Sequence, residues 1–323
     1  MKIDLIAGAR PNFMKIAPII DNINILYKTN KKIIEYRIIH TGQHYDDNMS
    51  GLFFKQLGIP LPDYNLNVGS GSQAEQTAKI MIGYEQVLIE NLCDLCIVVG
   101  DVNSTMACAI VAKKMGIKVA HIEAGIRSYD LNMPEEINRM VTDSISDYFF
   151  TTSESANKNL LKNGVDSEKI YFVGNTMIDT LSKYRSHFSK PDLWDKIGLI
   201  ENNYIVMTLH RPSNVDNQTQ LKDLICEILS NSEGIPVIFP IHPRTAKRLE
   251  SIIIPFQNFF PIEPLIYFEF NYLVERSKAV ITDSGGITEE TTVMNIPCMT
   301  LRDNTERPET IELGTNELLG TNP

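Results

Sequence analysis

The chain has 323 residues and a formal charge of −10. Its length suits two α/β domains of about 150 residues each, and its composition, 43% hydrophobic and 22% charged, is typical of a soluble globular protein. The acidic balance argues against nonspecific nucleic-acid binding, which needs a basic face. No apolar run reaches the roughly 20 residues of a membrane span. The N-terminus lacks the apolar segment of a signal peptide, so we expect a cytoplasmic protein that contacts no membrane.

Short β-type runs alternate with helical patterns through the first half of the chain. They predict strands near residues 2–8, 35–41, 96–100, 118–122, 148–152 and 169–173. Helices should begin between Pro11 and Pro18, at Asn103 and at Pro134, because proline and capping residues favour helix starts. This βα order predicts a parallel sheet covered by helices.

The pattern restarts after Gly174, with strands expected near residues 203–209, 236–241, 278–283 and 297–301. We therefore predict an N-terminal Rossmann-like domain over residues 1–173 and a C-terminal one over residues 174–323. The fold class that this order favours is α/β, with two doubly wound domains facing each other across a cleft.

The five cysteines are scattered along the chain. An odd, scattered set fits reduced thiols better than a disulfide framework. Cys93 and Cys96 form a CxxC pair, but no second pair or nearby histidines complete a zinc site. We expect no metal.

Acidic motifs gather between residues 100 and 139. Asp101 and Glu123 follow buried strands, at the edge where open α/β sheets bind ligands. Glu135 and Glu136 follow Pro134 in the first turn of a predicted helix, where the helix dipole alone favours acids. Carboxylates gathered at such an edge predict proton transfer on a bound small molecule, because burial and crowding separate their pKa values.

A second motif, residues 282–290, follows a strand and opens a helix. Ser284 and two glycines allow backbone N–H groups to approach an anion, and Glu290 lies where a carboxylate accepts from ribose hydroxyls. A plain strand-to-helix turn explains the same residues equally well. Cations at other strand ends favour the anion site: Arg10 with Lys15, His210 with Arg211, and His242 with Arg244. No GxGxxG or P-loop motif follows any strand.

Taken together, these motifs resemble the non-hydrolysing UDP-N-acetylglucosamine 2-epimerase family, which has the two-domain glycosyltransferase B fold. The resemblance runs from residue 3 to about 320. It rests on Gly8-Ala9-Arg10-Pro11 with Lys15, Thr41-Gly42-Gln43-His44, Gly100-Asp101, His121-Ile122-Glu123-Ala124-Gly125 with Arg127, Pro134-Glu135-Glu136 with Asn138-Arg139, His210-Arg211, His242-Pro243, Thr282 to Glu290 and Arg302 to Glu309. It implies interconversion of UDP-N-acetylglucosamine and UDP-N-acetylmannosamine without NAD or a metal.

The resemblance also implies two sets of site residues. The catalytic set is Asp101, Glu123, Glu135, His210, Lys15 and Arg10. The substrate and UDP set is Arg10, Phe270, Ser284, Gly285, Gly286 and Glu290, with Arg139, Arg211, His242 and Arg307 as weaker members. Salt bridges that stabilise loops explain Arg139 and Arg307 as well as ligand binding does. Glu136 is expected to serve the helix start.

The chemistry explains why several carboxylates are present. The hydrogen on C2 is very weakly acidic, and the family's route removes it as UDP leaves C1, which gives a bound 2-acetamidoglucal. UDP and a proton then add back from the other face, so each face needs an acid or base. We expect Asp101 and Glu135 to serve opposite faces. Arg10, His210 and the helix start at Ser284 would stabilise the departing diphosphate.

Some family features remain open. Gln43, His44 and Arg211 match members that bind a second UDP-N-acetylglucosamine as an activator, whereas Asp46 and Ser70-Gly71 depart from that pattern. The family's C-terminal helix is expected to be missing after Pro323 or dispensable. A homodimer and a role in surface polysaccharide synthesis are family-level expectations.

The alternatives are a hydrolysing epimerase that releases UDP and N-acetylmannosamine, a glycosyltransferase of the same fold, and a catalytically silent UDP-sugar sensor. Three carboxylates count against a glycosyltransferase, which usually needs one catalytic base.

Overall fold

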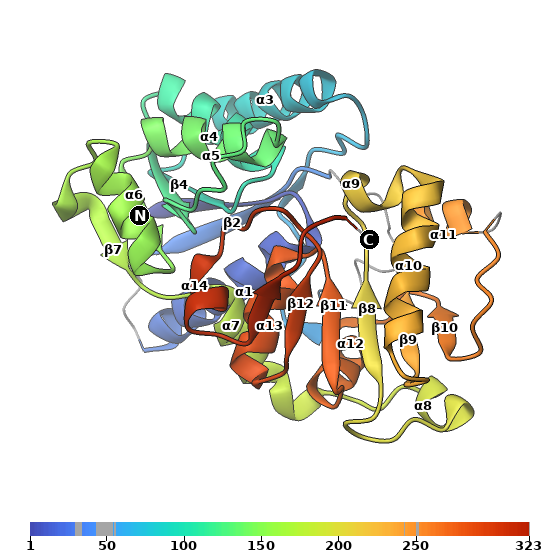
Figure 1. The fold of residues 1–323 in the computed structure, drawn as a ribbon. Coiled ribbons are helices and arrows are strands. Elements are labelled where there is room, and N and C mark those ends of the chain that lie inside the picture. Colours follow the sequence, from blue (N-terminus) through green and yellow to red (C-terminus); the bar gives the residue numbers. More distant parts are fainter. Residues whose placement is uncertain (30–33, 43–53, 55, 242, 250–251, 323) are drawn as a thin grey trace. The chain divides into compact units, whose positions relative to one another are not determined.

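The computed structural model describes residues 1–29, 34–42, 54, 56–241, 243–249 and 252–322. It divides into two compact units, Met1–Ser182 and Lys183–Pro323, each built on its own sheet (Figure 1). Residues 174–182, assigned to the second domain from the sequence, thus group with the first unit. Helix α7 (Thr176–Tyr184) is held there, since the Thr180 hydroxyl donates to the carbonyl of Met14.

Among the described residues, the first unit has seven parallel strands in the order β3-β2-β1-β4-β5-β6-β7. They are β1 (Lys2–Ala7), β2 (Glu35–His40), β3 (Tyr64–Asn65), β4 (Leu95–Val99), β5 (Lys118–Ile122), β6 (Tyr148–Thr151) and β7 (Ile170–Phe172). Every predicted strand is present, and β3 is additional. The direction of strand order reverses between β1 and β4, so the ligand-binding edge of the sheet is expected there.

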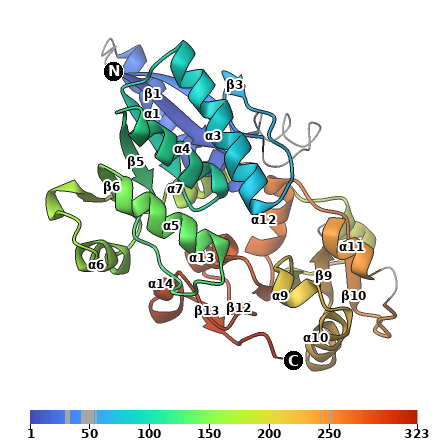
Figure 2. The same ribbon diagram turned by 90° about the horizontal axis from the view of Figure 1, so that it is seen from above.

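Helices cover both faces of this sheet. They are α1 (Arg10–Lys28), α3 (Gln73–Glu90), α4 (Asn103–Lys114), α5 (Pro134–Ile145), α6 (Glu154–Lys162) and α7. Figure 2 shows α3, α4 and α5 side by side on one face. The starts predicted at Asn103 and Pro134 are confirmed, and α1 begins with Pro11 in its first turn. Small residues such as Ala107 and Ala112 are fully buried and let α4 approach the sheet closely.

The second unit repeats this plan, with six parallel strands among its described residues in the order β10-β9-β8-β11-β12-β13. They are β8 (Ile205–Thr208), β9 (Val237–Pro240), β10 (Phe259–Ile262), β11 (Ala279–Thr282), β12 (Cys298–Thr300) and β13 (Asn316–Leu318). The predicted strands are again present, and β10 and β13 are additional. Strand order reverses between β8 and β11.

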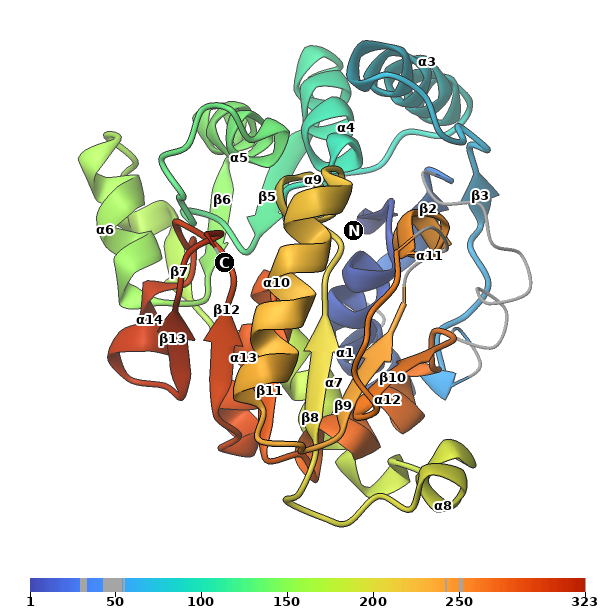
Figure 3. The same ribbon diagram turned by 45° about the vertical axis from the view of Figure 1, so that its right-hand side comes forward.

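The helices of the second unit are α8 (Leu193–Ile197), α9 (Pro212–Val215), α10 (Gln218–Asn231), α11 (Pro243–Leu249), α12 (Tyr267–Glu275), α13 (Gly285–Met294) and α14 (Pro308–Glu312). Figure 3 shows α10 on one face of the sheet and α12 and α13 on the other. In the described part of the chain, no helix has both the length and the apolar character needed to cross a bilayer.

One ion pair is buried inside the first sheet. Arg37 on β2 binds Asp4 on β1 through two hydrogen bonds, Nε to Oδ1 at 2.7 Å and NH2 to Oδ2 at 2.8 Å. The hydroxyl of Tyr84 on α3 donates to the same carboxylate at 3.1 Å. Asp4 and Tyr84 are fully buried, so loss of one partner would leave an uncompensated charge in the core.

We therefore expect Arg37→Met to lower the free energy of unfolding of the first unit by about 3–5 kcal/mol. Lys79→Ala, which breaks the exposed Lys79–Glu75 pair on α3, should change it little. Urea unfolding followed by far-UV circular dichroism measures the loss. Trp194, the single tryptophan, lies in the second unit and reports on that unit separately. Equal stability of the two variants would contradict the prediction.

Candidate active site

The turn after β1 is fixed by one asparagine at the switch point of the first sheet. The side-chain oxygen of Asn12 accepts from the backbone N–H groups of Gly8, at 3.1 Å, and Ala9, at 2.9 Å. Its amide nitrogen donates to the carbonyl of Val99 at the end of β4, at 3.0 Å. Asn12 therefore joins the two strand ends between which the order reverses. Sequence reasoning missed it, because its partners are backbone atoms.

Lys15 and Glu123 meet at this point. The Lys15 ammonium forms an ion pair with Glu123 Oε2, and both residues are buried. A Cβ atom on Gly100 would lie 3.2 Å from that oxygen and 3.4 Å from the Lys15 nitrogen. The turn after β4 thus passes directly over the ion pair. Glu123 has a φ of +71°, a left-handed conformation that costs a non-glycine residue energy and occurs often at functional sites.

Asp101 is held by Arg139 from α5. Arg139 NH1 lies 2.5 Å from Asp101 Oδ2, and its Nε donates to Glu136 Oε2 at 2.9 Å. The Asp101 side chain is 34% exposed, whereas that of Arg139 is 3% exposed. Asp101 can therefore reach a ligand, and the buried Arg139 orients the Asp101 carboxylate. These contacts are those that the salt-bridge interpretation of Arg139 predicts.

Glu136 lies in the first turn of α5, as expected of a helix-start acid, and it also makes contacts outside the helix. It is 1% exposed, and its carboxylate accepts from the backbone N–H groups of Ser128, at 3.0 Å, and Tyr129, at 3.2 Å. With Arg139 it fixes the loop between β5 and α5. The spacing of Glu136 and Arg139, three residues apart on one helix face, was the signal available in the sequence.

Glu135 is exposed at the start of α5 and forms no hydrogen bond or ion pair with the described residues. The helix start itself is tied to the acidic turn, because Asn138 Nδ2 donates to the Asp101 carbonyl at 2.8 Å. The fold thus brings the Asp101 turn and the helix that carries Glu135 together. It leaves the Glu135 carboxylate available to a ligand. Arg10, at the first turn of α1, is half-buried.

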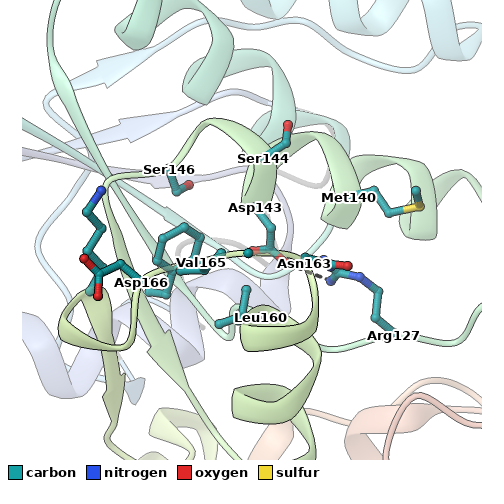
Figure 4. Close-up of a pocket in the computed structure, with 12 residues that line it drawn as sticks. Arg127, Met140, Asp143, Ser144, Ser146, Leu160, Asn163, Val165 and Asp166 are labelled. Carbon is teal, nitrogen blue, oxygen red and sulfur yellow. Dashed lines mark ion pairs between the residues drawn. The ribbon is translucent and has the colours of Figure 1, made fainter.

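A pocket of about 480 Å³ opens elsewhere in the first unit (Figure 4). Arg127 and Asp143 line it, together with residues of α6 and the loop after it, and none of the acid/base candidates does. The pocket is therefore separate from the predicted site.

In the second unit, a buried carboxylate organises the switch point. Asp283 accepts from the backbone N–H groups of His210, at 3.0 Å, and Arg211, at 2.9 Å, and pairs with His210 Nδ1 at 2.7 Å. Burial favours its neutral form, but His210 and these N–H groups outweigh burial and lower the pKa of Asp283. The His210 side chain is 50% exposed, and its Nε2 forms no hydrogen bond or ion pair with the described residues. It is therefore oriented for a ligand.

The start of α13 has the geometry expected of an anion site. Ser284 precedes the helix, and Gly285 and Gly286 form its first turn without a side-chain cap. A Cβ atom on Gly285 would lie 2.7 Å from Glu306 Oε1, so a side chain there would force the Glu306 carboxylate to move. The first N–H groups of α13 have no partner within the helix and can bind an anion.

Carboxylates hold the arginines nearby. Arg302 NH2 lies 2.6 Å from Glu306 Oε2. Burial favours a neutral Glu306, but Arg302 and its neighbours lower the pKa of this carboxyl to about 2. Arg211 lies 3.8 Å from the same carboxylate, and Arg307 pairs with Glu289 at 2.8 Å. The salt-bridge interpretation therefore describes the contacts of Arg307.

Glu290 is buried behind the helix start, where the Tyr267 hydroxyl donates to its Oε1 at 3.0 Å. Burial and the charge of Glu289 raise the pKa of Glu290 to about 7, although Tyr267 opposes the shift. Phe270 lies one turn after Tyr267 on α12 and is half-buried. Gln43, His44 and His242 lie outside the described residues.

Comparisons with known proteins place this geometry in context. The profile of the UDP-N-acetylglucosamine 2-epimerase family matches residues 28–323. A crystal structure of Methanocaldococcus jannaschii UDP-GlcNAc 2-epimerase, in complex with UDP-GlcNAc and UDP, is 45% identical with a TM-score of 0.89, covering 100% of this chain and 90% of that one.

More distant relatives extend the comparison. The UDP-2,3-diacetamido-2,3-dideoxy-D-glucuronate 2-epimerase of Pseudomonas aeruginosa is 39% identical, with 99% of this chain and 88% of that enzyme covered. The glycosyltransferase SnogD of Streptomyces nogalater shares the fold alone, at 11% identity and a TM-score of 0.56, covering 99% of this chain and 89% of its own.

These likenesses confirm the predicted fold class, two parallel-sheet α/β domains of the glycosyltransferase B type. The family match spans most of the sequence, and the resemblance noted from the motifs is confirmed. The chain belongs to the UDP-N-acetylglucosamine 2-epimerase family, a family of isomerases.

Proposed function

We propose that the protein is a non-hydrolysing 2-epimerase that interconverts UDP-N-acetylglucosamine and UDP-N-acetylmannosamine. The proposal rests on one observation. Two ion pairs, Lys15–Glu123 and Asp101–Arg139, meet at the switch point of the first sheet. Several charged groups there can donate or accept a proton. The M. jannaschii relative bound to UDP-GlcNAc and UDP supports the same class of ligand.

The proposed reaction has two steps. A base removes the C2 proton while the C1–O bond breaks, its electron pair leaves with UDP, and a double bond forms between C1 and C2. UDP then adds back to C1 as an acid protonates C2 from the other face. Asp101 and Glu135 are the proposed groups on opposite faces.

The second unit would bind the leaving group. The N–H groups at the start of α13 and His210 are its proposed donors to the diphosphate, and Arg10 of the first unit is a further proposed donor. The carboxylate of Glu290 would accept from the ribose hydroxyls, and Phe270 would lie near the uracil. None of these steps uses NAD or a metal.

The sugar and the assembly are further proposals. The P. aeruginosa relative acts on a diacetamido uronate, so that sugar is the competing substrate. A homodimer would cover apolar side chains exposed on α3 and α5, such as Ile82, Ile137 and Met140. A cytoplasmic location fits cysteines that form no disulfide. We further propose that the product is a precursor for surface polysaccharide synthesis.

Substitution tests the acid/base assignment. We expect Asp101→Asn, Glu123→Gln and Glu135→Gln each to lower the rate of C2 exchange by at least about 100-fold while UDP still binds. Glu154→Gln is the matched control for Glu135, because Glu154 is also an exposed acid in a first helical turn, that of α6. Near-normal exchange in a variant removes that residue from the mechanism, and lost UDP binding indicates misfolding.

Proton NMR in heavy water tests the reaction type. With UDP-N-acetylglucosamine we expect deuterium at C2 in sugar that is still joined to UDP, because the intermediate stays bound between the two steps. Equal release of free UDP and free sugar would instead identify a hydrolysing epimerase, and transfer to an added acceptor a glycosyltransferase. Bound UDP-sugar without exchange would identify a sensor. Parallel assays with the diacetamido uronate decide the substrate.

Glu290 predicts a proton linkage. In the free protein the pKa of Glu290 is raised from its ordinary value of 4.5 to about 7. The contribution of Glu290 to folding stability is therefore complete below pH 4.5 and is lost as the pH rises through about 7. Ribose hydroxyls favour the ionised form, so UDP binding at about pH 6 should release up to about one proton more from the native protein than from Glu290→Gln. Calorimetry in buffers of different ionisation enthalpy measures the difference. Equal proton release would contradict the ribose assignment.

A further inference from the structure

His121 is a fully buried polar residue in the middle of an apolar strand. Its neighbours on β5, Ala120 and Ile122, are buried apolar residues, and His121 itself has no exposed surface. Burial of an imidazole costs energy unless its nitrogens are hydrogen-bonded. Its place two residues before Glu123 therefore calls for a physical explanation.

Both ring nitrogens of His121 have a partner that accepts. Nε2 lies 2.8 Å from the carbonyl oxygen of Gly100, and Nδ1 lies 2.6 Å from Asp143 Oδ1. Burial favours a neutral Asp143, but His121 and Arg127 outweigh burial and lower the pKa of this carboxyl. Because a backbone carbonyl only accepts, the contact with Gly100 is a hydrogen bond that a proton on Nε2 donates.

The Gly100 carbonyl belongs to the peptide that joins Gly100 to Asp101. This peptide is planar, so a hydrogen bond to its oxygen also fixes the direction in which Asp101 leaves the turn. The N–H group of Gly100 donates to the carbonyl of Ile122, at 3.0 Å. The turn that carries Asp101 is thus held on both sides by the strand that leads to Glu123.

Asp143 connects the ring to two further segments. Its Oδ2 accepts from the backbone N–H of Gly125, at 3.1 Å, and lies 2.7 Å from Arg127 NH1 (Figure 4). Asp143 itself lies on α5, the helix that begins beside Glu135. One buried charge cluster, His121 with Asp143 and Arg127, therefore joins the three segments that carry the acid/base candidates.

We propose that His121 is a positioning residue for the epimerisation reaction, acting through the Gly100 carbonyl to set Asp101 relative to Glu123. Asp143 holds the ring in this orientation. His121 does not touch the substrate, because it is fully buried. The inference rests on the proposed function, since it assigns a role within that reaction.

Two amide substitutions test the role of each ring nitrogen. In His121→Gln the amide nitrogen lies near the former Nε2 and keeps the Gly100 contact. In His121→Asn it lies near the former Nδ1 and keeps the Asp143 contact. We expect kcat for C2 exchange to fall about 100-fold in the Asn variant and about tenfold or less in the Gln variant, with KM and UDP affinity nearly unchanged in both.

If the role of His121 were merely structural, the loss of kcat in each variant would follow its loss of thermal stability. Tyr84→Phe, which removes a buried hydrogen bond to Asp4 in the same sheet, is the control and should lower stability with kcat unchanged. Normal kcat in the Asn variant, or an equal loss in both His121 variants, would overturn the inference while leaving the proposed function intact. Absence of exchange in the native protein would overturn both.

One measurement needs no substitution and so does not depend on how the variants fold. Nitrogen-15 NMR of the histidine rings in the native protein should show a proton on His121 Nε2, the nitrogen that faces the Gly100 carbonyl. An Nε2 that carries no proton could not donate to that carbonyl and would overturn the inference.

Discussion

Mutual neutralisation of buried charges at the carboxyl end of the first sheet is the constraint on which the site depends. Glu123, Glu136 and Asp143 are at most 5% exposed, and an isolated carboxylate so placed would take up a proton or destabilise the fold. Each is instead paired with a cation, Glu123 with Lys15, Glu136 with Arg139 and Asp143 with Arg127. The pairing lets an acidic cluster form inside a protein that is already strongly acidic, and it leaves Asp101 and Glu135 at the surface.

In both units, the candidate site residues lie at the point where the strand order of the sheet reverses. In each unit, the turns that follow the two strands on either side of the switch point meet. These strands are β1 and β4 in the first unit and β8 and β11 in the second. Asn12 joins the turns in the first unit, and Asp283 joins them in the second. The first unit gathers proton donors and acceptors there, whereas the second presents helix N–H groups and an oriented histidine. The proposed reaction, with its diphosphate leaving group, calls for both kinds of group.

The sequence predicted what long apolar runs determine. Strands such as β1 and β4 were expected because buried parallel strands read as continuous apolar segments, and Asp101 and Glu123 followed from the strand ends. The additional strands β3, β10 and β13 are short edge strands of two to four residues. Segments this short contain too few alternating apolar and polar residues to predict a strand from the sequence.

Other features depend on contacts that a sequence does not display. Glu136 was assigned to the helix start because an acid is favoured in any first turn, while its actual partners are backbone N–H groups of an irregular loop. The role of His121 depends on a carbonyl from the neighbouring strand. Residues 174–182 group with the first unit, where a hydrogen bond between residues far apart in the chain attaches α7 to α1.

The central claim is that the bond between C1 and the diphosphate breaks while the intermediate stays bound. Positional isotope exchange tests it most directly, with UDP-N-acetylglucosamine that carries oxygen-18 in the bridge between C1 and the β-phosphorus. The account predicts that the label moves into the non-bridging β-phosphate positions as C2 acquires deuterium, because the freed phosphate rotates before UDP adds back. Deuterium at C2 with the label still confined to the bridge would contradict it.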